Sequence, residues 1–216
     1  MSGMFHSAIN FNQDLSGWDV SSVTNMNSMF REAISFNQNL SDWDVSSVSD
    51  MRFMFSRAIS FNGDLGRWDV SSVDNMYQMF SYATSFNQKI GLWDVSSVTD
   101  MSLMFLGASN FNQDFSKWDV SSVTDMDRMF RQATSFNQNL SLWDVSSVTN
   151  MGSMFLSVTL STDNYDALLS GWSSRNLRRN VFFDGGNSRY SITSQAARDI
   201  LTSGFAWSVS DGGVAP

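Results

Sequence analysis

Apolar residues recur along this chain with a fixed period of 25 residues, and mostly polar residues fill the positions between them. In the first complete unit the apolar positions are Leu15, Trp18, Val20, Val23, Met26, Met29, Phe30, Ala33 and Phe36. Six such units follow a truncated first copy. One short unit cannot bury its own apolar face and has to stack on its neighbours, so this period is typical of a solenoid.

Each unit is expected to contain a short strand and a short helical segment. The opening pattern L-x-x-W-x-V places Trp18 and Val20 on one side of an extended chain and Asp19 on the other. Over Met26–Ala33 the apolar residues are three and four apart, which predicts a short helix, which Asn25 can cap, or 3₁₀ turns. Stacked units would then pair their strands in a parallel ladder with a spacing of about 4.8 Å.

The repeated tryptophan has two interpretations. Its phase matches that of the neighbouring Leu and Val positions, which favours a place in the core over a row of exposed platforms for sugars. The methionines lie three positions apart beside a phenylalanine, which favours core filling over copper ligation. We therefore expect a structural core column at Trp18, Trp43, Trp68, Trp93, Trp118 and Trp143.

The repeat fades after Phe155, which divides the chain into a solenoid over 1–160 and a capping segment over 161–216. A solenoid needs such a cap because its last coil would otherwise expose core to water. The pattern predicts a helix from Asp163 or Asn164 to about Gly171 and a second helix from Ser194 through Thr202. It also predicts strands at 181–183 and 205–209, so the cap is expected to be α/β.

Composition excludes several classes of function. The 216-residue chain has a formal charge of −8, which argues against nucleic acid and anionic membranes as partners. It has no cysteine, and therefore no disulfide or thiolate metal site. No apolar run reaches 18 residues, so we expect no membrane insertion. The first residues, MSGMFHSAIN, lack the features of a signal peptide and follow the phase of the repeat, which indicates a fragment of a longer protein.

Little in the sequence indicates catalysis. The chain has one histidine, His6, at a variable place in the truncated copy, and it has no nucleotide-binding motif. We therefore expect a protein that is not an enzyme and that has no cofactor, apart from one alternative that involves Ca²⁺.

That alternative concerns an acidic column. An aspartate follows each repeated tryptophan, at Asp19, Asp44, Asp69, Asp94, Asp119 and Asp144. Hydrogen bonds from the following serines and backbone N–H groups are the favoured explanation for this column. The alternative is a Ca²⁺ site, because calcium prefers oxygen ligands, and its ligands would be Asp69, Asp94 and Asp119.

The place before each tryptophan varies while the apolar lattice stays fixed, which indicates an exposed surface. Together with the acidic column, this place supplies the candidate ligand-binding residues Asp42, Arg67, Asp69, Leu92, Asp94, Lys117 and Asp119. Drift on an unconstrained face would give the same variation, so the pattern alone leaves both explanations open.

The unit Phe-Asn-Gln-x-Leu-Ser-x-Trp-Asp-Val-Ser-Ser-Val-Thr-x-Met-x-x-Met-Phe-x-x-Ala resembles a known repeat. It is similar to the 25- to 26-residue repeat of bacterial surface proteins and mycoplasma lipoproteins, which is grouped with BspA-like leucine-rich repeats. The resemblance covers residues 1 to about 160. It implies a leucine-rich-repeat-like, right-handed solenoid on a secreted or surface-anchored protein, with a role in adhesion.

Three functions are therefore expected to compete. The leading one is a secreted or cell-surface adhesion module that binds an extracellular protein or glycan. The second is a rigid spacer without a ligand of its own. The third is an ice- or mineral-binding face, although Ser49 and Asp74 interrupt the threonine column that it would need. The open first coil could also pair with a second copy of the chain.

Overall fold

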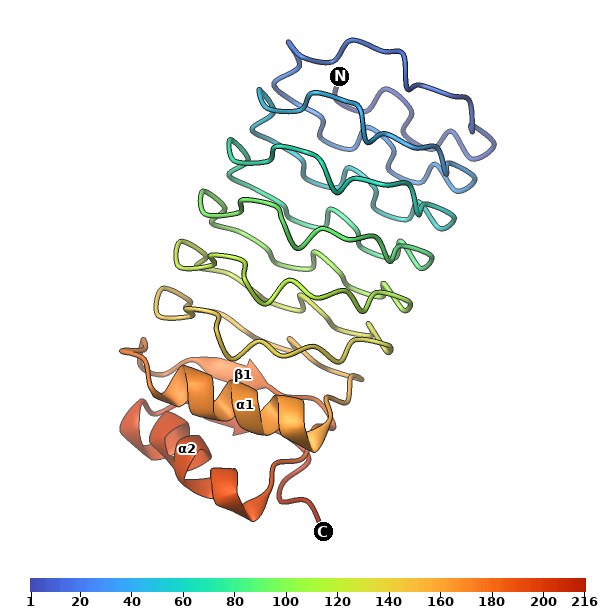
Figure 1. The fold of residues 1–216 in the computed structure, drawn as a ribbon. Coiled ribbons are helices and arrows are strands. Elements are labelled where there is room, and N and C mark those ends of the chain that lie inside the picture. Colours follow the sequence, from blue (N-terminus) through green and yellow to red (C-terminus); the bar gives the residue numbers. More distant parts are fainter.

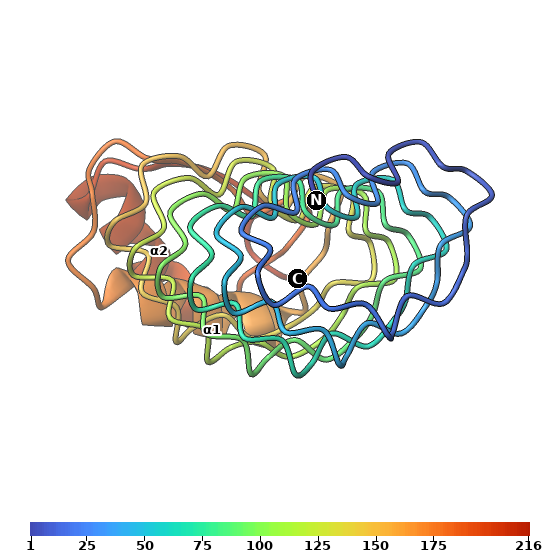
Figure 2. The ribbon, with the colours of Figure 1, turned by 90° about the horizontal axis from the view of Figure 1, so that it is seen from above.

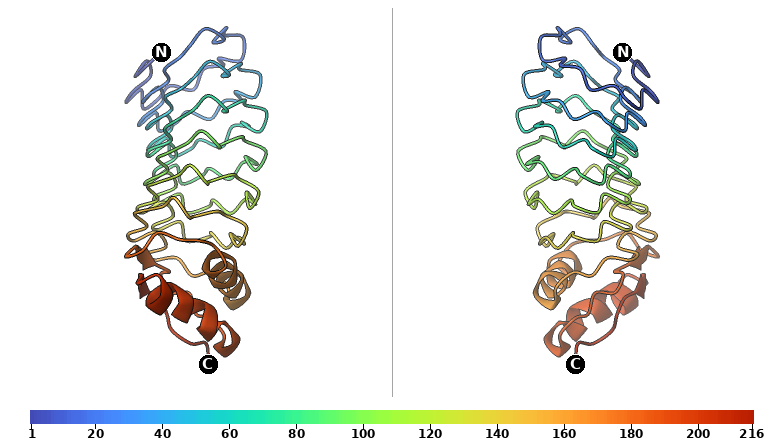
Figure 3. Two further views of the ribbon diagram at one scale, coloured as in Figure 1. Left: turned by 90° about the vertical axis from the view of Figure 1, so that its left-hand side faces the viewer. Right: turned by 90° about the vertical axis from the view of Figure 1, so that its right-hand side faces the viewer.

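The computed structural model describes residues 1–216, and the chain winds through a stack of coils towards a helical C-terminal end (Figure 1). Seen from above, the coils are flattened loops, each displaced a little from the one before (Figure 2). Two side views show the same stack ending beside helix α1 (Thr162–Ser173) (Figure 3). None of the helices combines the length and the apolar composition that crossing a membrane requires.

Neighbouring coils are joined by parallel backbone bonding between positions one period apart. The residue before the first methionine of each unit forms a bridge with its equivalent, as in Asn25 with Asp50 and Asp50 with Asn75. Beyond it, alternate N–H groups donate to the next coil, as Ser28 does to Arg52 at 2.9 Å. The bridges pair residues one period apart, so the ladder keeps equivalent positions of neighbouring coils side by side.

Of the two alternatives for Met26–Ala33, no helix forms, and the segment consists of turns. Ser28 and Glu32 have φ of +57° and +60°, and the same two places are left-handed in later units. Alternate N–H groups of this segment bond to the next coil, so they are not free to bond four residues back along their own chain, as an α-helix requires. The N–H groups of Met29, Arg31 and Ala33 bond instead to carbonyls three residues back and close successive turns.

The predicted strand at the start of each unit is also absent. The Trp18 N–H donates to the Leu15 carbonyl at 3.0 Å, and the Val23 N–H donates to the Val20 carbonyl at 2.8 Å. Both bonds close tight turns within the coil. The parallel ladder therefore lies several residues later than predicted, and the L-x-x-W-x-V pattern reflects inward-facing turn residues.

A single apolar core of 62 buried residues runs through the stack. Phenylalanines form continuous columns in it, with the ring centroids of Phe30 and Phe55 in consecutive coils 5.5 Å apart and the ring planes nearly parallel. Five repeat tryptophans are buried in it, as the phase of the pattern predicts, whereas Trp18 in the first complete unit is only half-buried. Each fully buried side chain of this kind stabilises the fold by roughly 1.5–3 kcal/mol.

The C-terminal segment is built from short elements that follow α1. Strands β1 (Phe182–Asp184) and β2 (Ser208–Ser210) pair in parallel. Between them lie the 3₁₀ turn η1 (Ile192–Ser194), helix α2 (Gln195–Asp199) and the π-helical turn η2 (Ile200–Gly204). Helix α1 contains the predicted span. The second helix differs from the prediction, because Ser194 makes no side-chain cap bond and the helix changes type after Asp199.

The cap continues the bonding of the repeat without its sequence. Trp172 of α1 donates through Nε1 to the Leu140 carbonyl at 3.1 Å. Each buried repeat tryptophan makes the same kind of bond to a carbonyl of the coil that precedes it. The Ser161 N–H donates to the side chain of Asn137 at 2.8 Å, in the same way that successive repeat asparagines are joined. Met151 forms a parallel bridge with Phe183 of β1. The last coil is therefore covered by a segment that satisfies its exposed groups.

Candidate functional site

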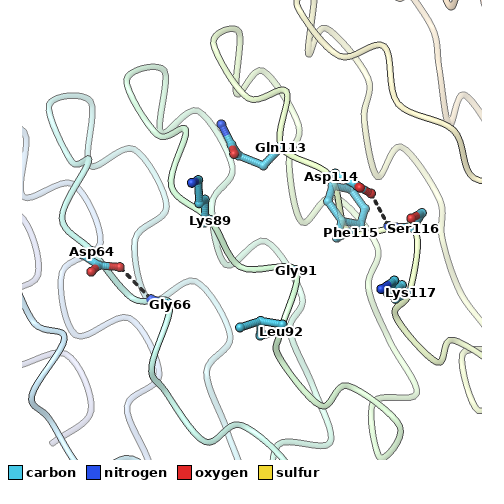
Figure 4. Close-up of a pocket in the computed structure, with 10 residues that line it drawn as sticks. All are labelled: Asp64, Gly66, Lys89, Gly91, Leu92, Gln113, Asp114, Phe115, Ser116 and Lys117. Atoms are coloured by element: carbon cyan, nitrogen blue, oxygen red, sulfur yellow. Dashed lines mark hydrogen bonds between the residues drawn. The ribbon is translucent and has the colours of Figure 1, made fainter.

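A groove of about 400 Å³ lies where the opening segments of three consecutive units meet at the surface (Figure 4). Its lining residues are Asp64, Gly66, Lys89, Gly91, Leu92, Gln113, Asp114, Phe115, Ser116 and Lys117. Only two of these ten residues are hydrophobic. The only two lysines in the chain, Lys89 and Lys117, both line this groove.

Two glycines allow neighbouring coils to approach each other closely at the groove. Gly66 and Gly91 stand where other units carry serine. A Cβ atom on Gly91 would lie 2.4 Å from the Asp114 carbonyl oxygen, and one on Gly66 would lie 2.9 Å from that of Lys89. The groove therefore depends on residues without a side chain at these two places.

The two carboxylates of the groove close tight turns. Asp64 accepts the Gly66 N–H at 2.8 Å, and Asp114 accepts the Ser116 N–H at 2.9 Å, each through Oδ1. The backbone N–H and hydroxyl of Ser116, with a further contribution from the charge of Lys117, hold the pKa of Asp114 below its usual value. Each aspartate uses only Oδ1 for its turn, so its second carboxylate oxygen has no hydrogen bond in the structure.

The lysines and the leucine of the groove have no such engagement. Every ion pair in the structure uses an arginine, and no hydrogen bond involves the side chain of Lys89 or Lys117. Leu92 is 93% exposed, more than any other large hydrophobic residue. In Figure 4, Gly91 and Leu92 lie between the two lysines. The groove thus offers free cationic donors, free carboxylate acceptors and a small apolar surface.

Of the candidates named from the sequence, Leu92 and Lys117 line the groove. Asp42 and Arg67 lie outside its lining, and their charged groups face each other 3.9 Å apart at the surface. Sequence reasoning missed Lys89. A signal for it exists, because its place in other units is always aspartate or asparagine.

The acidic column that follows the tryptophans makes local hydrogen bonds. Asp94 accepts both the N–H and the hydroxyl of Ser96, at 3.0 and 2.6 Å, and these bonds lower its pKa, the hydroxyl contributing most. Asp69 accepts the same two groups from Ser71. Asp119 accepts a backbone N–H at 3.0 Å. None of these three aspartates lines the groove, and no group of three or more acidic or histidine side chains is placed so that it could hold a metal ion.

The comparisons with known proteins concern the repeat. No curated protein and no solved structure matches the chain. One family model matches residues 1–91 and again residues 63–172, so the two matches together span the repeats and helix α1 apart from its last residue. The repeated unit is thus the unit of a bacterial repeat family, and the chain belongs to the family described as Mycoplasma protein of unknown function, DUF285.

Proposed function

We propose that the chain is a secreted or cell-surface binding module used in adhesion, and that the groove around Gly91 holds part of its extracellular ligand. The observation that carries this proposal is the meeting of Lys89, Lys117 and Leu92 in one groove. Charged donors without a partner and a fully exposed leucine gain free energy when a ligand covers them. The rest of the acidic surface carries no other lysine.

We also propose that residues 1–160 form a leucine-rich-repeat-like, right-handed solenoid of the BspA-like kind. The parallel bridges between residues one period apart and the continuous core support a solenoid. Membership of a mycoplasma repeat family is compatible with the BspA-like assignment. A module of this shape presents a long lateral surface, which suits recognition of large extracellular partners.

One observation favours a rigid spacer as the second candidate. The core is one cluster that runs from Leu15 into the cap at Trp207, so the stack has no flexible break along its length. A spacer needs only this continuity, whereas a binding module also needs the groove to bind a ligand. The two functions therefore differ in what happens when the groove is changed.

Two leucines in the same repeat column provide a matched test. Leu92 lines the groove, and Leu142 is 65% exposed two units further along, outside it. Wild type, Leu92→Ser and Leu142→Ser would be screened on arrays of extracellular glycans and host proteins. We expect capture by wild type and Leu142→Ser and loss of capture by Leu92→Ser. A lack of capture by all three proteins would favour the spacer.

A further inference from the structure

The place one residue before each unit carries a turn cap in five of the six units. Its aspartate or asparagine side chain accepts the backbone N–H two residues further on, at distances between 2.8 and 2.9 Å. The five capped pairs are Asp14–Ser16, Asn39–Ser41, Asp64–Gly66, Asp114–Ser116 and Asn139–Ser141. The cap is thus a regular part of the coil.

The unit in the middle of the groove lacks this cap. Lys89 stands in the cap position, and an ammonium group has donors but no acceptor. The Gly91 N–H, which the cap would bond, has no acceptor in the structure. Gly91 lines the groove and is partly exposed. The coil therefore has a free N–H two residues after a lysine, where its neighbours bond this N–H to an aspartate side chain.

We propose that the groove binds the carboxylate of a uronic acid, whose oxygen takes the place of the missing cap. One carboxylate oxygen accepts the Gly91 N–H, and Lys89 and Lys117 compensate the charge of the ligand. Hydrogen bonds between a carboxylate and cationic or backbone donors are among the stronger ones in proteins. This inference rests on the proposed binding function and names the class of ligand for the same groove.

The rest of the groove favours a sugar as the carrier of the carboxylate. Asp64 and Asp114 each use only Oδ1 for their turn, so their second oxygens can accept hydrogen bonds from sugar hydroxyls. Leu92 offers a surface on which the C–H face of a pyranose ring can lie. The two lysines and two aspartates balance in formal charge, which suits a sugar with a single carboxylate better than a densely charged polyanion.

The Gly91 amide provides a direct probe. ¹⁵N-labelled protein would be titrated with glucuronic acid, glucose, acetate and a short glutamate-containing peptide, while amide resonances are followed by NMR. We expect glucuronic acid to shift the Gly91 resonance and to saturate it at the lowest concentration, with acetate weaker and glucose inactive. No shift of Gly91 with any carboxylate would overturn the inference, and so would equal binding of glucose or tighter binding of the peptide.

A matched pair of variants tests the role of the missing cap. Lys89→Asn introduces the residue that Asn39 and Asn139 already place in this position, so folding is retained and Gly91 gains an acceptor. Arg128→Asn removes the same charge at an exposed residue outside the groove, where φ is +54° and asparagine is well tolerated. We expect Lys89→Asn to weaken glucuronic acid binding about tenfold or more, with Arg128→Asn unchanged.

The result can be separated from that of the array screen. If Lys89→Asn binds glucuronic acid as tightly as wild type does, the carboxylate site is wrong. The binding function would still stand if array capture persists in wild type and depends on Leu92. If wild type captures nothing on the arrays, the proposed function itself fails.

Discussion

The indole N–H of Trp93 donates a hydrogen bond to the backbone carbonyl of Leu65, one coil earlier, at 3.0 Å. Equivalent bonds join every buried repeat tryptophan to the preceding coil. The ring of Trp93 also stacks between those of Trp68 and Trp118, with centroids 6.3 Å away on each side. A leucine in this place could supply packing but no donor, which explains why the heaviest residue of the unit does not vary.

Replacing Trp93 tests this double role. Trp93→Ala should lower the free energy of unfolding by about 3–5 kcal/mol, because it leaves a cavity in a close-packed core. Trp93→Phe fills much of that volume but loses the indole donor, and we expect a smaller cost of about 1–2 kcal/mol. Urea unfolding followed by circular dichroism would measure both. Equal losses for the two variants would show that the hydrogen bond between coils contributes nothing.

A ladder of asparagine side chains is a second link between coils. The Oδ1 atom of Asn87 accepts the Asn112 N–H at 3.0 Å and the Gln113 Nε2–H at 2.9 Å. Asn87→Ala removes both acceptors and should cost about 1 kcal/mol, since the site is only half-buried. Hydrogen exchange of the Asn112 amide should become faster. Asn87→Asp is the control, because it keeps an acceptor, and it should leave that amide protected.

The acidic column predicts a loss of stability in acid. Hydrogen bonds from the Ser96 hydroxyl and N–H lower the pKa of Asp94 in the folded state, and the same kind of bonds lower that of Asp44. A folded pKa below the unfolded one gives stability that is present above the unfolded value and is lost as pH falls through the folded one. The melting temperature should therefore fall as pH drops below about 4. Asp94→Asn should flatten this dependence, and an unchanged slope would contradict the assignment.

The core could be predicted from the sequence because periodicity reports burial directly. The phase that Leu15, Trp18 and Val20 share is the inward phase whichever backbone conformation joins them. The ladder could not be placed from this pattern, because turns and a strand can present the same alternation. The turns are favoured because residues with a left-handed backbone, such as Ser28 and Glu32, donate their N–H groups to the next coil. Neither serine nor glutamate indicates a left-handed conformation in the sequence.

The groove could be predicted only in part. Leu92 and Lys117 stand out because they vary within a fixed lattice. Lys89 could be found only by comparing units, because every equivalent position holds an aspartate or an asparagine. The contribution of Gly91 depends on the distance to the Asp114 carbonyl, which is a property of the neighbouring coil. The sequence shows which residues occupy equivalent positions of the repeat. Which of these residues come close across neighbouring coils is decided by how the coils stack.

The cap is held by a charged cluster that can be tested separately from the repeats. Asp211 accepts from Arg198 Nε at 2.8 Å and from the Tyr165 hydroxyl at 2.9 Å, and its side chain is only 2% exposed. Burial, together with the nearby carboxylate, raises the pKa of Tyr165. Asp211→Asn removes the charged acceptor of Arg198 and should cost roughly 2 kcal/mol. Limited proteolysis should then cut the cap faster while the repeats stay resistant. Equal protection of the cap in both proteins would argue against this role.

Calcium distinguishes the two explanations of the acidic column. Like charges about 4 Å apart repel by about 1 kcal/mol in water, so salt of any kind should raise the melting temperature modestly by screening. If the aspartates serve only their turns, as the bonds from Ser71 to Asp69 and from Ser96 to Asp94 indicate, CaCl₂ and NaCl should act alike at equal ionic strength. A ligand that binds only the folded state would instead stabilise it well beyond screening. A calcium-specific rise in melting temperature that Asp94→Asn removes would make these aspartates metal ligands.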